Sequence, residues 1–312
     1  MACAQLPAVR NMWDISVPQM AFEYQPLLHA LLAIAALHRA TLLPNETRRL
    51  QHICQMHIVH SIQHHRERIT EMSRADKGLV ADEPVCVNAM LISFYALALR
   101  RETFPEPYEP PTQWLYMARG VRAVVRTIYH QAMQSSGSRI RPIMLESPHI
   151  PVASRNKLIC SDTRASPPPP FGFLLHCHCD EEQADEKLRK AYTVSVVYLN
   201  SLYAAVKNRA PDYEVRKRFT GFPAIVPKRF LALVAEKRPR ALVILAHFFA
   251  FGKLVEDIWW LRGIPEREVY GVYSILPPQW RWAMNWPLLL ASFPPGTMAD
   301  DIDIPLPTAE LT

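Results

Sequence analysis

Hydrophobic positions recur at helical spacing along most of this chain. Residues 27–37 are almost wholly apolar, interrupted by His29, which predicts a helix buried at the centre of a bundle. Elsewhere apolar stripes alternate with polar faces. They predict further helices at residues 46–72, 85–99, 113–133, 181–206, 227–236, 239–261, 266–276 and 278–291. The pattern therefore predicts an all-α fold.

Two proline-rich segments interrupt this periodicity. Residues 135–170 hold Gly, Ser, Pro and isolated charges, ending in four consecutive prolines that favour extended polyproline II. The last residues, 292–312, are acidic and rich in proline, which is typical of a disordered tail. We therefore predict a single large helical domain over residues 13–291, with a loop insertion at 135–180 and a disordered tail at 292–312.

Composition fits a globular chain. It has 49% hydrophobic and 21% charged residues, and its 9 glycines against 28 prolines disfavour the glycine-dependent phosphate-binding α/β folds. The net charge of +6 is scattered without a basic run, which indicates solvated surface rather than a nucleic-acid-binding arm. Residues 27–37 are too short to cross a bilayer, so we expect no membrane span and an intracellular protein with reduced thiols.

Tryptophan is concentrated near the C-terminus. Five of the seven tryptophans, Trp259, Trp260, Trp280, Trp282 and Trp286, fall in one short stretch interleaved with helical periodicity. These tryptophans belong to the stretch 230–287. This stretch, together with the segments 13–21 and 27–38, resembles the C-terminal regulatory domain of fungal zinc binuclear cluster transcription factors, of the sterol uptake control type. The resemblance covers roughly residues 13–287.

The resemblance implies a helical regulatory domain that encloses a hydrophobic pocket for a sterol or isoprenoid-like molecule and changes its interactions when that ligand leaves. It also implies a nuclear or cytoplasmic location, with a protein partner or a second copy of the chain. His247 and Lys253 would be the polar groups that orient the ligand. The expected ligand-binding residues are His247, Phe248, Phe251, Trp259, Trp260, Trp282 and Trp286.

The zinc cluster of that family has no counterpart among these residues. A binuclear cluster needs two Cys-x2-Cys pairs within about 30 residues, so that six thiolates converge on two metals. Six cysteines occur here, but none of them forms a Cys-x2-Cys pair. Only 12 residues precede Trp13, so we expect no direct sequence-specific DNA binding by this chain. Whether the gene product lacks an upstream cluster stays open.

Histidines suggest one candidate metal site. His57, His60, His64 and His65 lie on one predicted helix, and the i, i+4 spacing of His60 and His64 places two imidazoles on one face. Because the sequence indicates no third ligand, a polar, partly exposed helix face is the favoured interpretation.

The segment from His176 to Glu182 is the densest group of ligand-type side chains. In an extended strand, Cys177 and Cys179 would point to one side and His176 and His178 to the other, so the four cannot share one tetrahedral centre without a turn. An extended lead into a helix is favoured, with metal binding as the alternative.

An enzyme of secondary metabolism is the second hypothesis, such as an atypical sesquiterpene cyclase acting on farnesyl diphosphate. It would need Mg²⁺, for which Asp180, Glu181 and Asp185 are the candidates, although they do not match the cyclase motif. Aromatic side chains would stabilise carbocations through cation–π attraction. The candidate catalytic residues are Lys253, Glu256 and Asp257. No cofactor is predicted for a regulator, and an interaction or scaffold protein is a third hypothesis.

Overall fold

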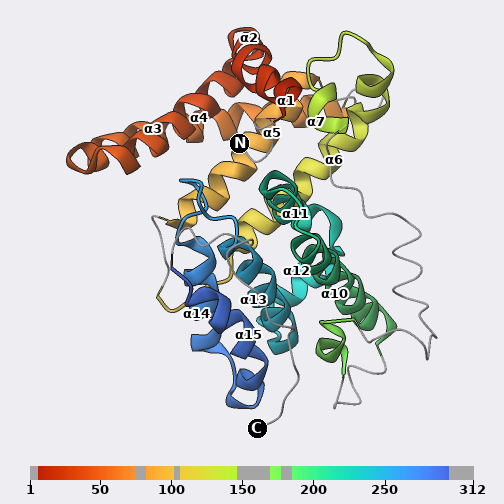
Figure 1. Ribbon diagram of the computed structural model, residues 1–312. Helices are drawn as coiled ribbons and strands as arrows, with labels where there is room; N and C mark the ends of the chain where they lie inside the picture. Colours follow the sequence, from red (N-terminus) through yellow and green to blue (C-terminus); the bar gives the residue numbers. More distant parts are fainter. Residues whose placement is uncertain (1–5, 75–81, 102–105, 146–168, 177–184, 295–312) are drawn as a thin grey trace. The chain divides into compact units, whose positions relative to one another are not determined.

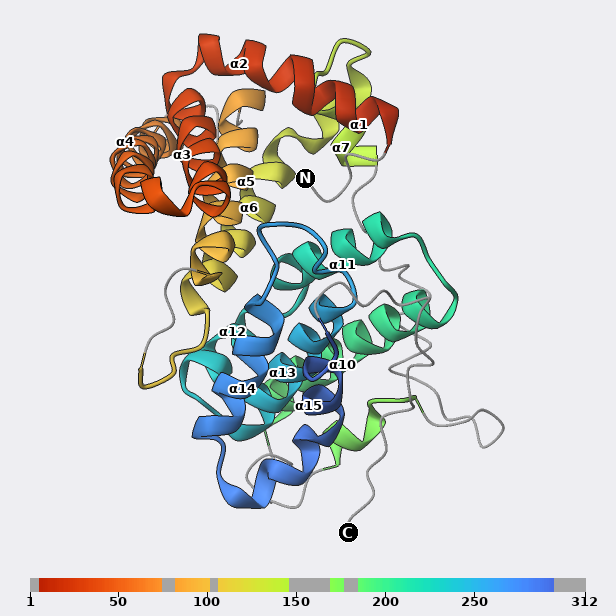
Figure 2. The ribbon, with the colours of Figure 1, turned by 60° about the vertical axis from the view of Figure 1, so that its left-hand side comes forward.

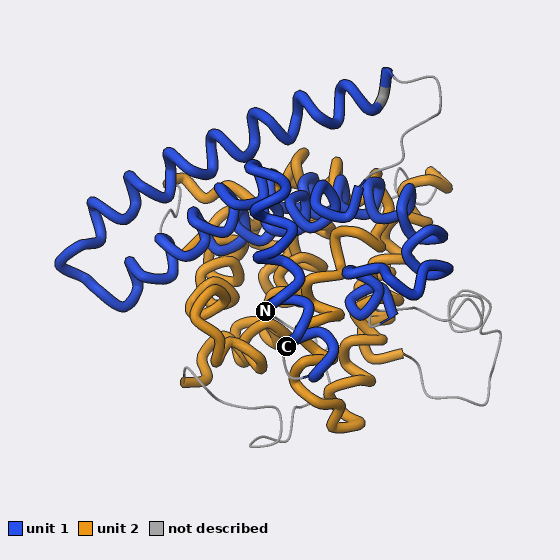
Figure 3. Tube along the Cα trace, turned by 90° about the horizontal axis from the view of Figure 1, so that it is seen from above, with its two compact units in different colours: residues 1–99, 113–147 blue, residues 100–112, 148–312 orange. Residues whose placement is uncertain are grey.

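The computed structural model describes residues 6–74, 82–101, 106–145, 169–176 and 185–294. Every regular element in these ranges is helical (Figure 1), which confirms the all-α prediction. The chain divides into two compact units, residues 1–99 with 113–147 and residues 100–112 with 148–312 (Figure 3). The expected single domain over 13–291 stays a prediction. Much of the expected insertion, and the tail after residue 294, lie outside the described residues.

The first unit is built around a helical hairpin. Helices α3 and α4 make the most extensive contact of any pair, and they lie side by side in Figures 1 and 2. A π-helical turn, η1 (Met12–Ser16), joins α1 to α2, and a 3-10 turn, η2 (Pro44–Glu46), joins α3 to α4. The α-helices are α1 (Pro7–Asn11), α2 (Val17–Glu23), α3 (Gln25–Leu42), α4 (Thr47–Arg74), α5 (Glu83–Ala98), α6 (Thr112–Gln134) and α7 (Arg141–Leu145).

Helix α5 is the core helix of this unit, since it contacts α2, α3 and α4 and buries residues on every side. Its buried Asn88 accepts a hydrogen bond of 3.1 Å from Ser61 of α4. Glu83–Arg101 is also long and apolar enough to cross a membrane by length and composition alone, a property that buried core helices share. By contrast α3, the expected central helix, has an exposed side on which Leu32 is 41% accessible.

The second unit surrounds one helix. Helix α13 (Pro239–Lys253) is buried at every position from Arg240 to Lys253, and it contacts α10, α11, α12, α14 and α15 (Figure 2). These neighbours are α10 (Glu186–Lys207), α11 (Asp212–Ile225), α12 (Lys228–Ala235), α14 (Ile264–Ile275) and α15 (Asn285–Ala291), with the 3-10 helices η4 (Gly172–Leu175) and η5 (Pro278–Met284). A helix that is buried on every side needs apolar residues around its whole circumference, and the sequence of α13 is largely apolar throughout.

Two predicted helices in this unit differ from the structure, and one helix was not predicted. Helix α13 ends at Lys253 rather than near residue 261, and a chain of turns leads to Gly263, whose φ of 77° is one that side chains rarely adopt. The predicted helix at 278–291 is a 3-10 helix followed by α15. Helix α11 was not predicted, and its basic triplet at 216–218 was interpreted only as solvated surface charge.

Candidate functional site

One side of α13 gathers part of the predicted ligand-binding set. The imidazole of His247 stacks on the indole of Trp286, with centroids 5.6 Å apart and planes 5° apart. The ring of Phe251 lies 5.2 Å from the same indole. Phe171, which precedes η4, meets all three rings edge-on at 5.3–5.8 Å. We call these four residues, Phe171, His247, Phe251 and Trp286, the Trp286 cluster.

Trp282 extends this group. Its ring lies 6.0 Å from that of Phe173, which is in turn 6.0 Å from the ring of His247. His247, Phe251, Trp282 and Trp286 therefore lie together, around two phenylalanines that the sequence analysis did not single out. The signal for these phenylalanines was Phe171-Gly-Phe173 directly after four prolines, where no helical period marks a side chain as buried.

The other predicted residues occupy different surroundings. Phe248 stacks between Phe219 and Phe222 of α11, at 4.4 and 4.0 Å. Trp259 and Trp260 follow the end of α13, where Trp260 is buried and the backbone oxygen of Trp259 accepts a hydrogen bond from Arg101. Because α13 is buried all round, successive aromatic residues on it face different neighbours. The set does not form one continuous lining.

His247 is the polar group of the Trp286 cluster. Its Nδ1 lies 2.8 Å from the carbonyl oxygen of Val243, which can only accept, so Nδ1 carries the ring hydrogen. Nε2 is then an unprotonated acceptor, and it has no hydrogen-bond partner in the described part of the chain. Complete burial lowers the pKa of His247 to about 4. At neutral pH the cluster therefore contains a neutral imidazole with a buried, unused acceptor.

The segment that carries Phe171 and Phe173 is held by two buried side chains. The backbone N–H of Phe171 donates to Oδ1 of Asn200 at 3.1 Å. Arg240 Nη1 donates to the carbonyl oxygens of Leu174 and, at 3.0 Å, His176. The guanidinium of Arg240 also lies over the ring of Trp280, 5.0 Å from its centroid. Of the ligand-type segment 176–182 only His176 is described, and what it contributes to these contacts is its backbone oxygen.

The candidate catalytic residues form ion pairs within the protein. Lys253 and Glu256 are both buried and pair at 2.7 Å. The second carboxylate oxygen of Glu256 accepts from the backbone N–H of Gly263 at 3.1 Å, which ties the turns after α13. Asp257 pairs at 2.5 Å with the largely buried guanidinium of Arg216. These contacts give each side chain a role in holding α11, α13 and the following turns together.

The candidate magnesium ligands are only partly described. Asp185 caps α10, where Oδ1 accepts from the backbone N–H of Leu188 at 3.0 Å. Asp180 and Glu181 lie outside the described residues. Within the described ranges no group of three or more His, Cys, Asp or Glu side chains could hold a metal ion. The magnesium hypothesis therefore stays a prediction.

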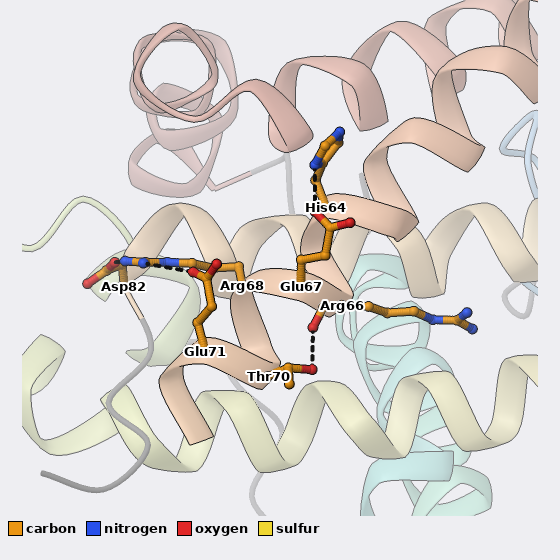
Figure 4. Close-up of polar contacts among 7 residues, drawn as sticks. All are labelled: His64, Arg66, Glu67, Arg68, Thr70, Glu71 and Asp82. Carbon is orange, nitrogen blue, oxygen red and sulfur yellow. Dashed lines mark hydrogen bonds and ion pairs between the residues drawn. The ribbon is translucent and has the colours of Figure 1, made fainter. Parts of the chain in front are cut away.

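The first unit has a pocket of about 710 Å³ that the sequence analysis did not predict. Its walls are charged: Arg139 pairs with Glu23 at 3.0 Å and with Glu83 at 3.4 Å. Arg68 pairs with Asp82 at 3.1 Å and lies between Asp82 and Glu71 in Figure 4. The ion pairs of Arg139 join segments far apart in the sequence, so no local pattern indicates them. A pocket of this polarity does not suit a sterol.

Known proteins resemble most of the chain. Residues 1–147 match the family model of the fungal specific transcription factor domain. A Zn(2)-C6 fungal-type transcription factor of Gibberella zeae is 30% identical over 95% of this chain and 60% of its own length. The transcription factor afumD of Aspergillus fumigatus is 29% identical over 79% of this chain and 61% of its own length.

More distant relatives carry the name sterol uptake control protein 2. The one from Saccharomyces cerevisiae is 25% identical over 82% of this chain and 26% of its own length. The chain thus spans about three fifths of the length of the first two relatives and about a quarter of the length of the Saccharomyces cerevisiae protein. No solved structure matches it. These matches confirm the resemblance found in the sequence: residues 1–147 are similar to the fungal specific transcription factor domain, and 95% of the chain aligns with a Zn(2)-C6 fungal-type transcription factor.

Proposed function

We propose that this chain is the regulatory part of a transcription regulator and that its second unit senses an apolar ligand carrying a hydroxyl group, such as a sterol. The regulatory role rests on the homology to zinc-cluster transcription factors along 95% of the chain. The sensing role rests on one observation, the unused acceptor of His247 inside an aromatic cluster.

The ligand chemistry follows from His247. A buried acceptor without a partner costs about 1–3 kcal/mol, so a molecule that donates one hydrogen bond there is favoured. The surrounding rings of Phe171, Phe251 and Trp286 offer no charge to a ligand, which selects for an apolar body. A sterol meets both requirements, and two relatives are named for the control of sterol uptake.

Ligand entry requires the cluster to open, because its rings are in contact. The element to move is the short segment 169–176, which carries Phe171 and Phe173 and is tied down by Asn200 and Arg240. Its displacement would change the surface available to a protein partner or a second copy of the chain. DNA contact would come from outside these 312 residues, which contain no Cys-x2-Cys pair, and we place the regulator in the nucleus.

The decisive experiment compares an alcohol with its ketone. Purified protein is titrated with a 3-hydroxysterol and with the matching 3-ketosteroid, which cannot donate a hydrogen bond. We expect at least tenfold tighter binding of the alcohol, and we expect His247→Phe to abolish this preference while His130→Phe, at an exposed site on α6, retains it. Equal affinities for alcohol and ketone, or no sterol binding at all, would refute the proposal.

A further inference from the structure

The pocket of about 710 Å³ in the first unit has the size of a small-molecule site. Three of its lining residues, Val85, Ile128 and Ala132, are apolar and almost completely buried, and we call them the floor of the pocket. The first belongs to the beginning of α5 and the other two to the last turns of α6. A ligand with an apolar body therefore finds a surface against which it can pack.

One arginine of this pocket is shared by two carboxylates. Both terminal nitrogens of Arg139 donate to the carboxylate of Glu23 at 3.0 Å, and Nε of Arg139 donates to Glu83 at 3.4 Å. The hydrogen bond from Arg139 is the main cause that lowers the pKa of Glu23, so this carboxyl group is ionised at neutral pH. A single guanidinium is thus set against two carboxylates.

Arg68 of α4 is shared in the same way. Its guanidinium pairs with Asp82 at 3.1 Å and with Glu71 at 3.7 Å (Figure 4). Among the described residues that line the pocket, the acidic side chains outnumber the arginines by three to two, and Glu71 lies beside them. Because the carboxylates exceed the guanidinium groups, the charge that this pocket attracts is positive.

Two hydroxyl groups of the lining can bind a further polar group. The hydroxyl oxygens of Tyr24 and Ser138 are buried, and neither has a hydrogen-bond partner in the described part of the chain. Burial raises the pKa of Tyr24 to about 12, so its phenol keeps the proton and can both donate and accept. Buried hydroxyls without partners are unfavourable, so a ligand hydroxyl that bonds to either of them is favoured.

We propose that this pocket binds a small organic cation, in which a short apolar body carries an ammonium group at one end and a hydroxyl at the other. The ammonium group would lie among the carboxylates of Glu23, Asp82 and Glu83, while the apolar body would cover the floor. The hydroxyl would bond to Tyr24 or Ser138. This site and its ligand are separate from the sterol site proposed in the second unit.

The test is a calorimetric titration with three probes of similar shape and different charge. They are tyramine, which is a cation, its neutral analogue p-ethylphenol and its anionic analogue hydroxyphenylpropionate. We expect one equivalent of tyramine to bind about tenfold more tightly than p-ethylphenol, and the anion to bind more weakly than either. Added salt should narrow the difference between tyramine and p-ethylphenol, because salt screens the attraction between charges.

Two isosteric replacements test the carboxylates. Glu83→Gln keeps an oxygen for the N–H groups of Arg139, and Asp82→Asn removes no helix cap, because the Asp82 side chain accepts no hydrogen bond at the start of α5. We expect each to weaken tyramine binding about threefold and to leave the affinity for p-ethylphenol unchanged. Glu46→Gln is the matched control, since its carboxylate pairs with Arg49 outside the pocket, and it should bind tyramine as the unaltered protein does.

Circular dichroism checks that each variant is folded. Absence of tyramine binding, or equal affinities for tyramine and p-ethylphenol, would overturn the proposal. So would an unchanged affinity for tyramine in folded Glu83→Gln or Asp82→Asn. None of these results bears on sterol binding in the second unit, so this proposal and the proposed function fail separately.

Discussion

The hydroxyl of Tyr108 donates a hydrogen bond of 2.7 Å to Oε2 of Glu268, although 160 positions separate the two residues. Both side chains are buried, and the other carboxylate oxygen of Glu268 accepts from Arg100 Nε at 2.6 Å. Burial is the main cause that raises the pKa of Tyr108 well above its usual value, so the phenol remains a donor. This contact fastens the segment 106–112 to α14 within the second unit.

Removing the phenol hydroxyl tests that contact. Tyr108→Phe leaves Oε2 of Glu268 buried without its donor, and we expect a loss of about 1–3 kcal/mol in the free energy of unfolding. Urea denaturation measures it. Tyr116→Phe, at an exposed position on α6, should change this free energy little. An unaltered unfolding midpoint for Tyr108→Phe would mean that water satisfies Glu268 equally well.

Gly271 of α14 gives a steric prediction at the same place. A Cβ atom there would lie 2.2 Å from Cδ2 of Tyr108, far inside contact distance. We expect Gly271→Ala to destabilise the protein by about 1–3 kcal/mol, because the buried ring cannot move aside without strain. Gly120→Ala on α6 is the matched control: nothing lies within 4 Å of its Cβ, and alanine favours helix by up to about 1 kcal/mol. Thermal unfolding of both variants should therefore show shifts of opposite sign.

His247 should make stability depend on pH. Its pKa is about 4 in the folded protein, against about 6.5 when exposed. Between pH 4 and pH 6.5 the imidazole is protonated in the unfolded chain but not in the folded protein. The free energy of unfolding is therefore greatest above pH 6.5 and falls as the pH drops towards 4. The full effect is about 3 kcal/mol.

Replacing the imidazole isolates this contribution. The fall in unfolding free energy between pH 7 and pH 4.5 should be smaller in His247→Phe than in the unaltered protein. Burial also lowers the pKa of His65 to about 4, so the variant should retain part of the dependence. Parallel pH profiles for the two proteins would contradict the burial of His247.

Arg240 should control the segment that covers the Trp286 cluster. Arg240→Lys removes the guanidinium group whose Nη1 donates to the carbonyl oxygens of both Leu174 and His176 and whose plane lies over the ring of Trp280. We expect hydrogen–deuterium exchange to accelerate at least tenfold in residues 171–176, with little change in α12. Arg229→Lys, whose partner Glu236 is half exposed, should leave the exchange of this segment unchanged.

Local patterns predicted the ends of three helices of the first unit well. Helices α4, α5 and α6 begin and end within two residues of their expected positions. Helix α11 was missed because Arg216 reads as surface charge, yet it is buried and paired with Asp257, 41 positions away. The partner that makes such burial acceptable is not visible in a local window.

The candidate site was harder to predict for a related reason. Aromatic periodicity on α13 correctly indicates burial, but it cannot tell which neighbour each ring meets. His247 and Phe248 are adjacent in sequence and face different groups of rings. The contact between His29 of α3 and His57 of α4, whose Nδ1 atoms are 2.7 Å apart, could not be predicted either, because it exists only when the two helices pack together.

Helix α13 is buried on every side. A ligand that displaces α13 on one side must therefore also change its packing on the opposite side. Protein interiors are filled as densely as molecular crystals, so a shift that makes room beside His247 must be absorbed where Phe248 sits between Phe219 and Phe222. A displacement of α13 beside Trp286 therefore changes the contacts between α13 and α11.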